Sequence, residues 1–305
     1  MINPHLLALA EATLVTILWS SSFVLIKWGL EELPPFLFAG LRYFGGFLVL
    51  LAFALALRRQ GPPRDLGLRR WVKLAGVGIA AYTLGNGFLF LSLTMIPAVT
   101  ASFVQGLIPL LVAVLGVLHL RERPSLLQIG GIGLALVGAY IFFPLHVAMG
   151  QAMGIIIALG AALSFAYQMI LVRDLSRDGV PGPLWLSIIS LGVGGGLLFL
   201  PAAFEPFPRL TMTSIAILLW LAVVNTAFAY VLWNHALEYL KAFEQAMVAN
   251  TMPLQIALWA WFLLGEELTL RMVIGLVVVV FGVFVVQADQ YIWSLLRRLS
   301  SGRAQ

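Results

Sequence analysis

Two long stretches of this chain contain no charged side chain. From Leu74 to Leu120, and again from Pro124 to Val172, there is no Asp, Glu, Lys or Arg. An α-helix rises about 1.5 Å per residue, so roughly 20 apolar residues cross a hydrocarbon layer of about 30 Å. Each stretch is therefore long enough for two membrane crossings. The chain is 61% hydrophobic and 10% charged, with a mean hydropathy of +1.00, which predicts an all-α protein that crosses a membrane many times.

Pro, Gly and charged residues divide the chain into ten candidate transmembrane helices. The N-terminus has no basic residue ahead of its apolar run, so we expect a first spanning helix rather than a cleaved signal peptide. The chain has no cysteine, which excludes disulfides and thiolate metal sites. The predicted spans are residues 5–27, 35–57, 71–94, 98–119, 125–144, 150–172, 182–201, 212–238, 243–264 and 270–290.

The distribution of basic residues predicts the orientation. With the N-terminus inside, fourteen Lys and Arg residues fall on the cytoplasmic side, whereas Lys27, Arg42, Arg209 and Arg271 fall outside or in the outer part of a span. Cytoplasmic loops carry an excess of basic residues. We therefore predict a multi-pass protein of the inner (plasma) membrane with both termini in the cytoplasm and a basic tail at 293–305. The net charge of +5 follows from this topology and does not indicate a nucleic-acid partner. The fourteen residues are Arg58, Arg59, Arg64, Arg69, Arg70, Lys73, Arg121, Arg123, Arg173, Arg177, Lys241, Arg297, Arg298 and Arg303.

The sequence contains one unit twice. "HLRERPSLLQIGGIGLALVGAY" at 119–140 returns as "LLGEELTLRMVIGLVVVVFGVF" at 263–284, an interval of 144 residues. Each unit holds five spans, an odd number, so the second must enter the membrane upside down. We predict two inverted repeats, 1–145 and 146–292, around a central cavity, a design common in secondary transporters with alternating access. An inert membrane scaffold with the same duplication is the alternative. The interval pairs Pro109 with Pro253, Glu122 with Glu266, Gly131 with Gly275 and Gly138 with Gly282.

The repeated motif itself is interpreted as structural. Ser125 and Thr269 are placed as helix N-caps, and Gln128 completes a capping box with Ser125. We predict that Glu122 and Glu266 organise loops and helix ends rather than touch a substrate. A seam of small residues that lets membrane helices approach closely is formed by Gly131, Ala135 and Ala139.

These paired motifs resemble the EamA-type transporters of the drug/metabolite transporter superfamily. Further similarity lies in "LWSSSFVLIK" in the first span and "FAGLRYFGG" in the second. The resemblance covers essentially the whole chain and implies a ten-helix fold whose cavity is lined mainly by helices 1, 3, 4, 6, 8 and 9. It also implies export of amino acids or related metabolites from bacteria, with the aromatic amino acid exporters closest in layout. The second-half counterparts "SFAYQ" and "WLSII" are degenerate, so the halves are not chemically equivalent.

Polar side chains inside the spans predict which helix faces look inward, because polar groups in hydrocarbon are costly and usually face a cavity. Tyr82 and Asn86 form a stripe that Thr226, Tyr230 and Asn234 continue in the other unit, where the interval maps Tyr82 onto Thr226 and Asn86 onto Tyr230. The predicted substrate cavity comprises Trp19, Ser22, Tyr82, Asn86, Ser102, Gln105, Tyr167, Gln168, Tyr230, Asn234 and Asn250.

Pro109 and Pro253 fall near the middle of equivalent spans and are predicted as kinks that serve gating. A proline inside a helix frees the carbonyl four residues back, here Gln105 and Ala249. The freed groups either find partners in neighbouring helices or face the cavity.

Charge narrows the solutes that we expect. No Lys or Arg lies in the middle third of a predicted span, so we expect an uncharged cavity; phosphates, which need strong cationic partners, are disfavoured. Aromatic and amide groups suit neutral, zwitterionic or aromatic solutes, or an organic cation over a ring. Arg42 is predicted to be structural and Lys27 to anchor its helix. Glu11 either carries a coupling proton or points to the cytoplasmic interface.

The leading hypothesis is a secondary exporter of small metabolites, amino acids first, by facilitated diffusion or proton antiport. Multidrug or organic-cation efflux by proton antiport and, in a different class, a non-transporting scaffold are the alternatives. An ATP-driven pump is not expected because GxxxxGK[ST] is absent, and an enzyme is not expected because the four histidines form no catalytic motif. We expect a small-molecule substrate and the lipid bilayer as partners, with no cofactor, metal, nucleic acid or obligatory protein partner.

Overall fold

The computed structural model describes residues 3–57, 67–120, 125–143, 148–177, 182–208 and 210–301, and within these ranges it contains helices and no strand. The first unit comprises α1 (Pro4–Gly29), α2 (Pro35–Leu57), α3 (Leu68–Gly78), the π-helix η1 (Ile79–Asn86), α4 (Gly87–Leu93), α5 (Ala98–Gly106), α6 (Ile108–Leu120) and α7 (Leu126–Phe142). The second comprises α8 (Met149–Arg177), α9 (Pro183–Leu197), α10 (Phe199–Ala202), α11 (Met212–Ala222), the π-helix η2 (Val223–Phe228), α12 (Ala229–Tyr239), α13 (Ala242–Ala249), α14 (Met252–Leu264) and α15 (Leu270–Ser301).

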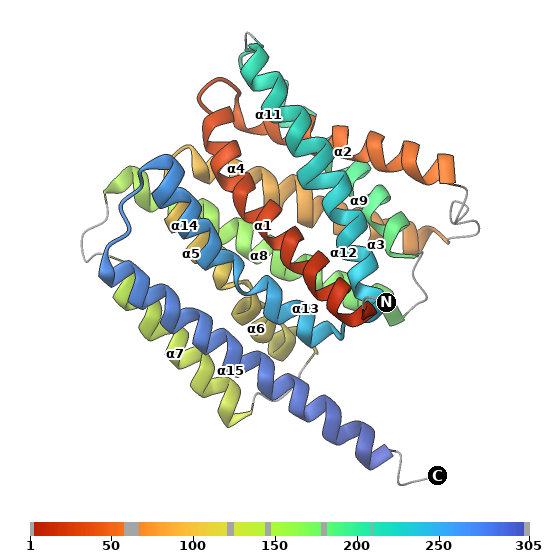
Figure 1. Ribbon diagram of the computed structural model, residues 1–305, viewed down its shortest axis with the longest axis vertical. Helices are drawn as coiled ribbons and strands as arrows, with labels where there is room; N and C mark the ends of the chain where they lie inside the picture. The colour runs from red at the N-terminus through yellow and green to blue at the C-terminus, as the bar shows by residue number, and fades with distance from the viewer. Residues whose placement is uncertain are drawn as a thin grey trace.

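These helices make the ten predicted crossings. Nine helical segments of the described chain are long and apolar enough to span a membrane, and α7 adds a tenth apolar helix of 17 residues. Most ends differ from the prediction by a few residues, but α15 continues past 290 to Ser301, so most of the predicted tail is helical. Both termini lie on the same side of the bundle (Figure 1), which we call the terminal side. Outside the described residues lie several predicted loop positions: Arg58, Arg59, Arg64, Arg121, Glu122, Arg123, His146, Arg209 and Arg303.

The packing of α7 against α15 shows that the second unit is inverted. The two helices lie side by side at one edge of the bundle (Figure 1). A Cβ on Gly131 would meet the carbonyl oxygen of Gly282 at 2.8 Å, and one on Gly138 would meet that of Gly275 at 2.8 Å. Low numbers on α7 pair with high numbers on α15, so the helices run antiparallel. Because they are the same element of the two units, the units have opposite orientations.

The small-residue seam on α7 differs slightly from the prediction. Ser125 and Gln128 form the expected capping box. The buried small residues are Gly131, Ala135 and Gly138, whereas Ala139 is half-buried. The spacing alternates between four and three residues because an α-helix has 3.6 residues per turn.

Each unit contains a π-helical segment at the same place. Residue 79 begins η1 and residue 223 begins η2, which the repeat interval pairs. Each segment has a side chain that donates to the carbonyl five residues back: Asn86 Nδ2 to Ala81 (2.9 Å) and Thr226 Oγ1 to Leu221 (2.8 Å). The i→i+5 pattern inserts a residue into the turn, which rotates the following residues relative to an α-helix.

Each unit also breaks a helix near its middle. The chain leaves α5 at Leu107 and leaves α13 at Asn250, and both prolines stand second in the next helix, Pro109 in α6 and Pro253 in α14. The backbone stays in the right-handed helical region at Leu107 and Asn250, so each proline follows a short interruption of the helix. The two interruptions also face one another, since a Cβ on Gly106 would lie 3.3 Å from Cγ of Pro253.

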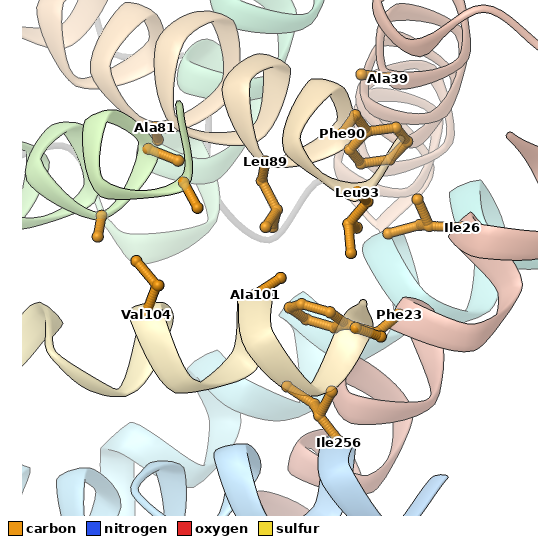
Figure 2. Packing of buried hydrophobic residues seen from close by; sticks show 14 of the residues in the cluster. Phe23, Ile26, Ala39, Ala81, Leu89, Phe90, Leu93, Ala101, Val104 and Ile256 are labelled. Carbon is orange, nitrogen blue, oxygen red and sulfur yellow. The ribbon is translucent and has the colours of Figure 1, made fainter. Parts of the chain in front are cut away.

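Buried apolar side chains close the bundle on the side away from the termini. Figure 2 shows Phe23, Ile26, Leu89 and Leu93 converging from α1 and α4 toward Ala101 of α5. All five are at most 7% exposed. We call Phe23, Ile26, Leu89, Leu93 and Ile256 the apolar plug.

Candidate substrate cavity

A cavity of about 770 Å³ lies between the two units. Its size matches pockets that bury small ligands. The six helices expected from the family resemblance all contribute to the wall. Three further spans contribute too, through residues such as Tyr43 of α2, Ser190 of α9 and Val283 of α15.

Most of the predicted site residues lie together on this wall. They come from α1, η1, α5, α8, α12 and the breaks in spans four and nine, so residues distant in sequence converge on one space. The predicted residues on the wall are Trp19, Ser22, Tyr82, Asn86, Gln105, Pro109, Gln168, Tyr230, Asn234, Asn250 and Pro253.

Ser102 and Tyr167 do not line the cavity. Ser102 is fully buried where α5 packs against α14, and its hydroxyl donates to the carbonyl of Val99 at 2.8 Å. Tyr167 is 42% exposed on another face of α8. The wall face of α8 carries Gln168 and Val172, and neighbouring residues of an α-helix point about 100° apart, so Gln168 on the wall turns Tyr167 away.

Glu11 lies beside the cavity rather than on its wall. Its Oε2 is 2.7 Å from Nδ1 of His235 on α12, and its side chain is 16% exposed. This contact joins the first unit to the second near the terminal side. Glu11 is therefore paired with His235 between the units and is absent from the cavity wall.

Arg42 contradicts the expectation of an uncharged cavity. The residue is 4% exposed and lines the cavity, where Nε donates to Thr226 Oγ1 and Nη2 donates to Ser22 Oγ, both at 3.3 Å. It reaches this position because α2 approaches η2 closely: a Cβ on Gly46 would lie 2.6 Å from Cγ2 of Thr226. The prediction of an uncharged cavity considered only where the backbone of each Lys and Arg lies along its span. It did not consider how far a long side chain extends from that position.

Hydrogen bonds between the units hold this region in place. The Asn225 amide donates to Ser22 Oγ (2.9 Å), and the Trp19 indole donates to the Asn225 carbonyl (3.1 Å). The Tyr82 hydroxyl donates to the Tyr230 hydroxyl (2.6 Å). Since Trp19 and Tyr82 belong to the first unit and Asn225 and Tyr230 to the second, movement of one unit against the other must break these bonds.

Aromatic rings form one side of the cavity. The ring of Trp19 lies 5.6 Å from that of Tyr230 and 5.0 Å from that of Trp233, centroid to centroid. Such distances are favourable for aromatic pairs. The wall therefore offers ring faces beside a cationic group.

Four buried polar side-chain atoms find no hydrogen-bond partner in the described part of the chain. An unsatisfied buried polar group costs about 1–3 kcal/mol. All four residues line the cavity, and these particular atoms are buried within its wall. The atoms are Gln105 Nε2, Ser190 Oγ, Asn225 Oδ1 and Asn234 Nδ2.

Sequence reasoning missed Arg42, Ser190, Asn225 and Trp233 as wall residues. The four-residue spacing identified Thr226 but not its neighbour Asn225. Both residues lie in η2 and both line the cavity, whereas an α-helical spacing places only one of two neighbours on a given face. Trp233 follows Tyr230 by three residues, a spacing that could have identified it. Ser190 carried no signal, since its span was assigned no polar face.

Two charged residues at helix ends behave as predicted. The carboxylate of Glu266 accepts hydrogen bonds from the backbone N–H groups of Ala98 (2.7 Å) and Val99 (2.9 Å), at the start of α5. Lys27 Nζ donates to the carbonyls of Leu93 and Ile96 and so anchors the end of α1. A carboxylate at a helix N-terminus accepts hydrogen bonds from backbone N–H groups that have no partner within the helix. Its negative charge also interacts favourably with the positive end of the helix dipole.

Comparison with known proteins places these features in context. The model of the "EamA-like transporter family" matches residues 6–143 and 152–287. The chain is 29% identical over 293 residues to a "Probable amino-acid metabolite efflux pump" of Salmonella typhimurium, covering 90% of this chain and 92% of that protein. It is 25% identical to an "Uncharacterized transporter" of Archaeoglobus fulgidus, with 91% and 96% covered. A solved structure titled "Crystal structure of protein" has a TM-score of 0.64 at 21% identity, with 92% of this chain and 96% of that chain covered, and so shares the fold.

Proposed function

Since the chain belongs to the EamA-like transporter family, we propose that it is a secondary transporter that exports small amino-acid-type metabolites, aromatic ones included, by alternating access. Nine helices of spanning length and the shorter apolar α7, all within the described chain, make it a multi-pass membrane protein. The single observation that carries the proposal is the cavity of about 770 Å³ between oppositely oriented units, whose wall carries polar and aromatic residues of both units. A packed scaffold gains nothing from such a cavity, whereas a transporter uses it to bind its solute.

The shape of the cavity supports alternating access. On one side the apolar plug residues Ile26, Leu89 and Ile256 end the wall. On the terminal side the wall continues to Val172 and to Gly182, the residue that precedes α9. With the termini in the cytoplasm, as the basic residues predict, this is the conformation that loads solute from inside.

Transport in the opposite conformation requires the reverse closure. The repeated breaks near Leu107 and Asn250 let each half of spans four and nine move as a separate rigid helix. We propose that rearrangement at these breaks, beside Pro109 and Pro253, opens the plug and closes the terminal side.

Organic-cation efflux is the weaker candidate. It requires an attractive acid in the cavity, but Glu11 lies outside the wall and Arg42 lies on it. A cationic guanidinium repels a cationic solute in a medium of low dielectric constant.

Reconstitution tests the proposed function. Purified protein in liposomes loaded with labelled phenylalanine is expected to show saturable efflux that protein-free liposomes lack. Efflux with and without a pH gradient separates antiport from facilitated diffusion. If proton coupling passes through the Glu11–His235 pair, Glu11→Gln removes the gradient-dependent part, while Glu31→Gln, in the turn after α1, keeps it. Efflux that never saturates in tight liposomes would contradict the proposal.

A further inference from the structure

Arg42 gives the cavity a single formal charge. Among the described residues that form the wall, no other Lys, Arg, Asp or Glu occurs. No carboxylate of the described chain lies within 4.0 Å of its guanidinium. Within the described chain, the cavity wall therefore carries a charge of +1 with no carboxylate paired to it.

The guanidinium has donors to spare. It carries five N–H donors in a planar fork, and its hydrogen bonds go from Nε to Thr226 and from Nη2 to Ser22. Both acceptors are neutral hydroxyls at 3.3 Å, and the ring of Tyr43 lies 5.0 Å from the guanidinium carbon. Neutral partners compensate a buried charge only in part, because desolvation of an ion is costly. An anion in the cavity would complete the compensation.

The fork selects the kind of anion. A guanidinium matches a carboxylate with two parallel hydrogen bonds. A phosphate monoester carries about −1.5 to −2 charges at pH 7, and the described wall offers one cation. One carboxylate balances the cavity, whereas a phosphate monoester would leave it negative.

We propose that Arg42 binds the carboxylate of the transported solute, and that the site takes carboxylates of net charge −1 at least as well as zwitterionic amino acids. The inference rests on the proposed function and narrows its substrate class to amino-acid-type carboxylates, including those whose amino group is acylated or absent. The carboxylate binds the Arg42 guanidinium, and an aromatic side chain packs on Trp19 and Tyr230.

The groups around Arg42 give an ammonium on the solute no anionic partner. The described wall contains no Asp or Glu, and the Asn225 side chain, which Ser22 links to Arg42, is fully buried. The wall therefore gains little from a positive group on the solute.

Competition against labelled phenylalanine efflux tests the inference in the reconstituted protein, with equal pH on both sides. The competitors are phenylalanine, N-acetylphenylalanine and phenylalanine amide, which share one ring and differ in charge. In the wild type we expect the two acids to compete about 10- to 100-fold better than the amide, as loss of a charge-assisted hydrogen bond pair implies. N-acetylphenylalanine should compete at least as well as phenylalanine.

Variants test whether the preference for acids over the amide depends on Arg42. Arg42→Gln should reduce the acid-to-amide ratio to within about twofold, because the fork and the charge are lost. Arg42→Lys, which keeps the charge without the fork, should give an intermediate ratio. Arg69→Gln, an exposed arginine at the start of α3, should leave the ratio unchanged. Equal competition by acid and amide in the wild type, or an unchanged ratio in folded Arg42→Gln, would overturn the inference.

The outcomes separate this inference from the proposed function. Saturable efflux without carboxylate preference contradicts the inference alone. Absence of saturable wild-type efflux contradicts the proposed function, and the inference is then decided by thermal stabilisation of the purified protein with the same three compounds. In that measurement the acids, and not the amide, should raise the Tm of the wild type, and this difference should vanish in Arg42→Gln. If Arg42→Gln does not fold, the inference is tested with Arg42→Lys and with the three compounds on the wild type.

Discussion

At the scale of single residues, Asn225 stands where the two units meet around the cationic group. It is fully buried, and its amide donates to the Leu18 carbonyl (2.5 Å) and to Ser22 Oγ (2.9 Å), which also accepts from Arg42. Asn225→Asp keeps the shape and places a carboxylate in the hydrogen-bond network that links position 225 to Arg42 through Ser22. We expect this internal counter-ion to weaken acid competition about tenfold or more, because it supplies the partner that the solute otherwise provides.

Asn225→Ala is the matched control for that prediction, because it removes the amide without adding charge. Its acid-to-amide ratio should stay closer to the wild-type value than that of Asn225→Asp. Both variants are compared by the competition assay on proteoliposomes. Equal ratios in the two variants would mean that the charge at this position does not act on the solute.

Ser190 tests whether the unpaired polar atoms are retained for function. Its hydroxyl is buried without a partner in the described chain, so Ser190→Ala removes an unsatisfied group. We expect a Tm that is unchanged or higher by a few degrees, since such a group costs about 1–3 kcal/mol, together with weaker phenylalanine competition. Thermal unfolding and transport are measured on the same preparation.

Ser92→Ala serves as the comparison for Ser190→Ala. Ser92 is equally buried, but its hydroxyl donates to the Leu89 carbonyl at 2.8 Å. Its removal should leave the Tm the same or lower and transport intact. A Tm loss in Ser190→Ala as large as in Ser92→Ala would show that the Ser190 hydroxyl is satisfied in the membrane.

The structure places many of the residues predicted from sequence on the cavity wall, and the residues that sequence reasoning missed include one whose side chain leaves its own helix face. Trp19, Asn86 and Gln105 were found because hydrocarbon penalises polar groups and so marks inward faces. Arg42 was missed because its reach depends on how closely Gly46 lets α2 approach η2, which is a tertiary distance. Ser102 lies between α5 and α14 instead, because contacts between helices also bury polar residues.

At the scale of elements, the spans and the repeated breaks were predictable, whereas the π-helices were not. Long apolar runs and repeated prolines are local signals that survive in one sequence. A π-helix is defined by i→i+5 hydrogen bonds, and no residue type in "IAAYTLGN" or "VVNTAF" requires that pattern. The position of Asn225 on the wall depends on η2, so this part of the site could not be predicted either.

The contact between α7 and α15 gives a prediction about stability. Gly138→Ala places a Cβ 2.8 Å from the Gly275 carbonyl oxygen and 2.7 Å from Val279 Cγ2. Overpacking of this kind costs about 1–3 kcal/mol, so we expect a lower Tm in detergent. Because this seam lies at the edge of the bundle, transport selectivity should not change.

A second glycine on α7 provides the control. Gly133 is exposed, and a Cβ there meets nothing within 4 Å. Gly133→Ala should leave the Tm unchanged or raise it, since alanine is favoured over glycine in a helix by up to about 1 kcal/mol. If both substitutions have the same effect, the close approach of α7 and α15 is not the reason for the glycine at 138.

At the scale of the whole molecule, the two units have opposite orientations, and this arrangement relates the paired helices and the cavity to the proposed transport. The equivalent elements α7 and α15 run antiparallel, and the bonds that cross the cavity connect one unit to the other. Two nearly equivalent units can exchange which side of the cavity is closed. The asymmetry lies in the side chains: Arg42 has Leu186 as its counterpart at the repeat interval, so the charge that lines the cavity comes from the first unit.

Inversion predicts opposite exposure for equivalent positions. Leu126 begins α7 and Leu270 begins α15, and they are 88% and 75% exposed. The chain has no native cysteine, so Leu126→Cys and Leu270→Cys each introduce a single thiol. With the termini in the cytoplasm, a membrane-impermeant maleimide should label Leu270→Cys in intact cells, and Leu126→Cys only after permeabilisation. Labelling of both from one side would refute the inverted arrangement, whereas a simple exchange of the two results would reverse the orientation and keep the fold.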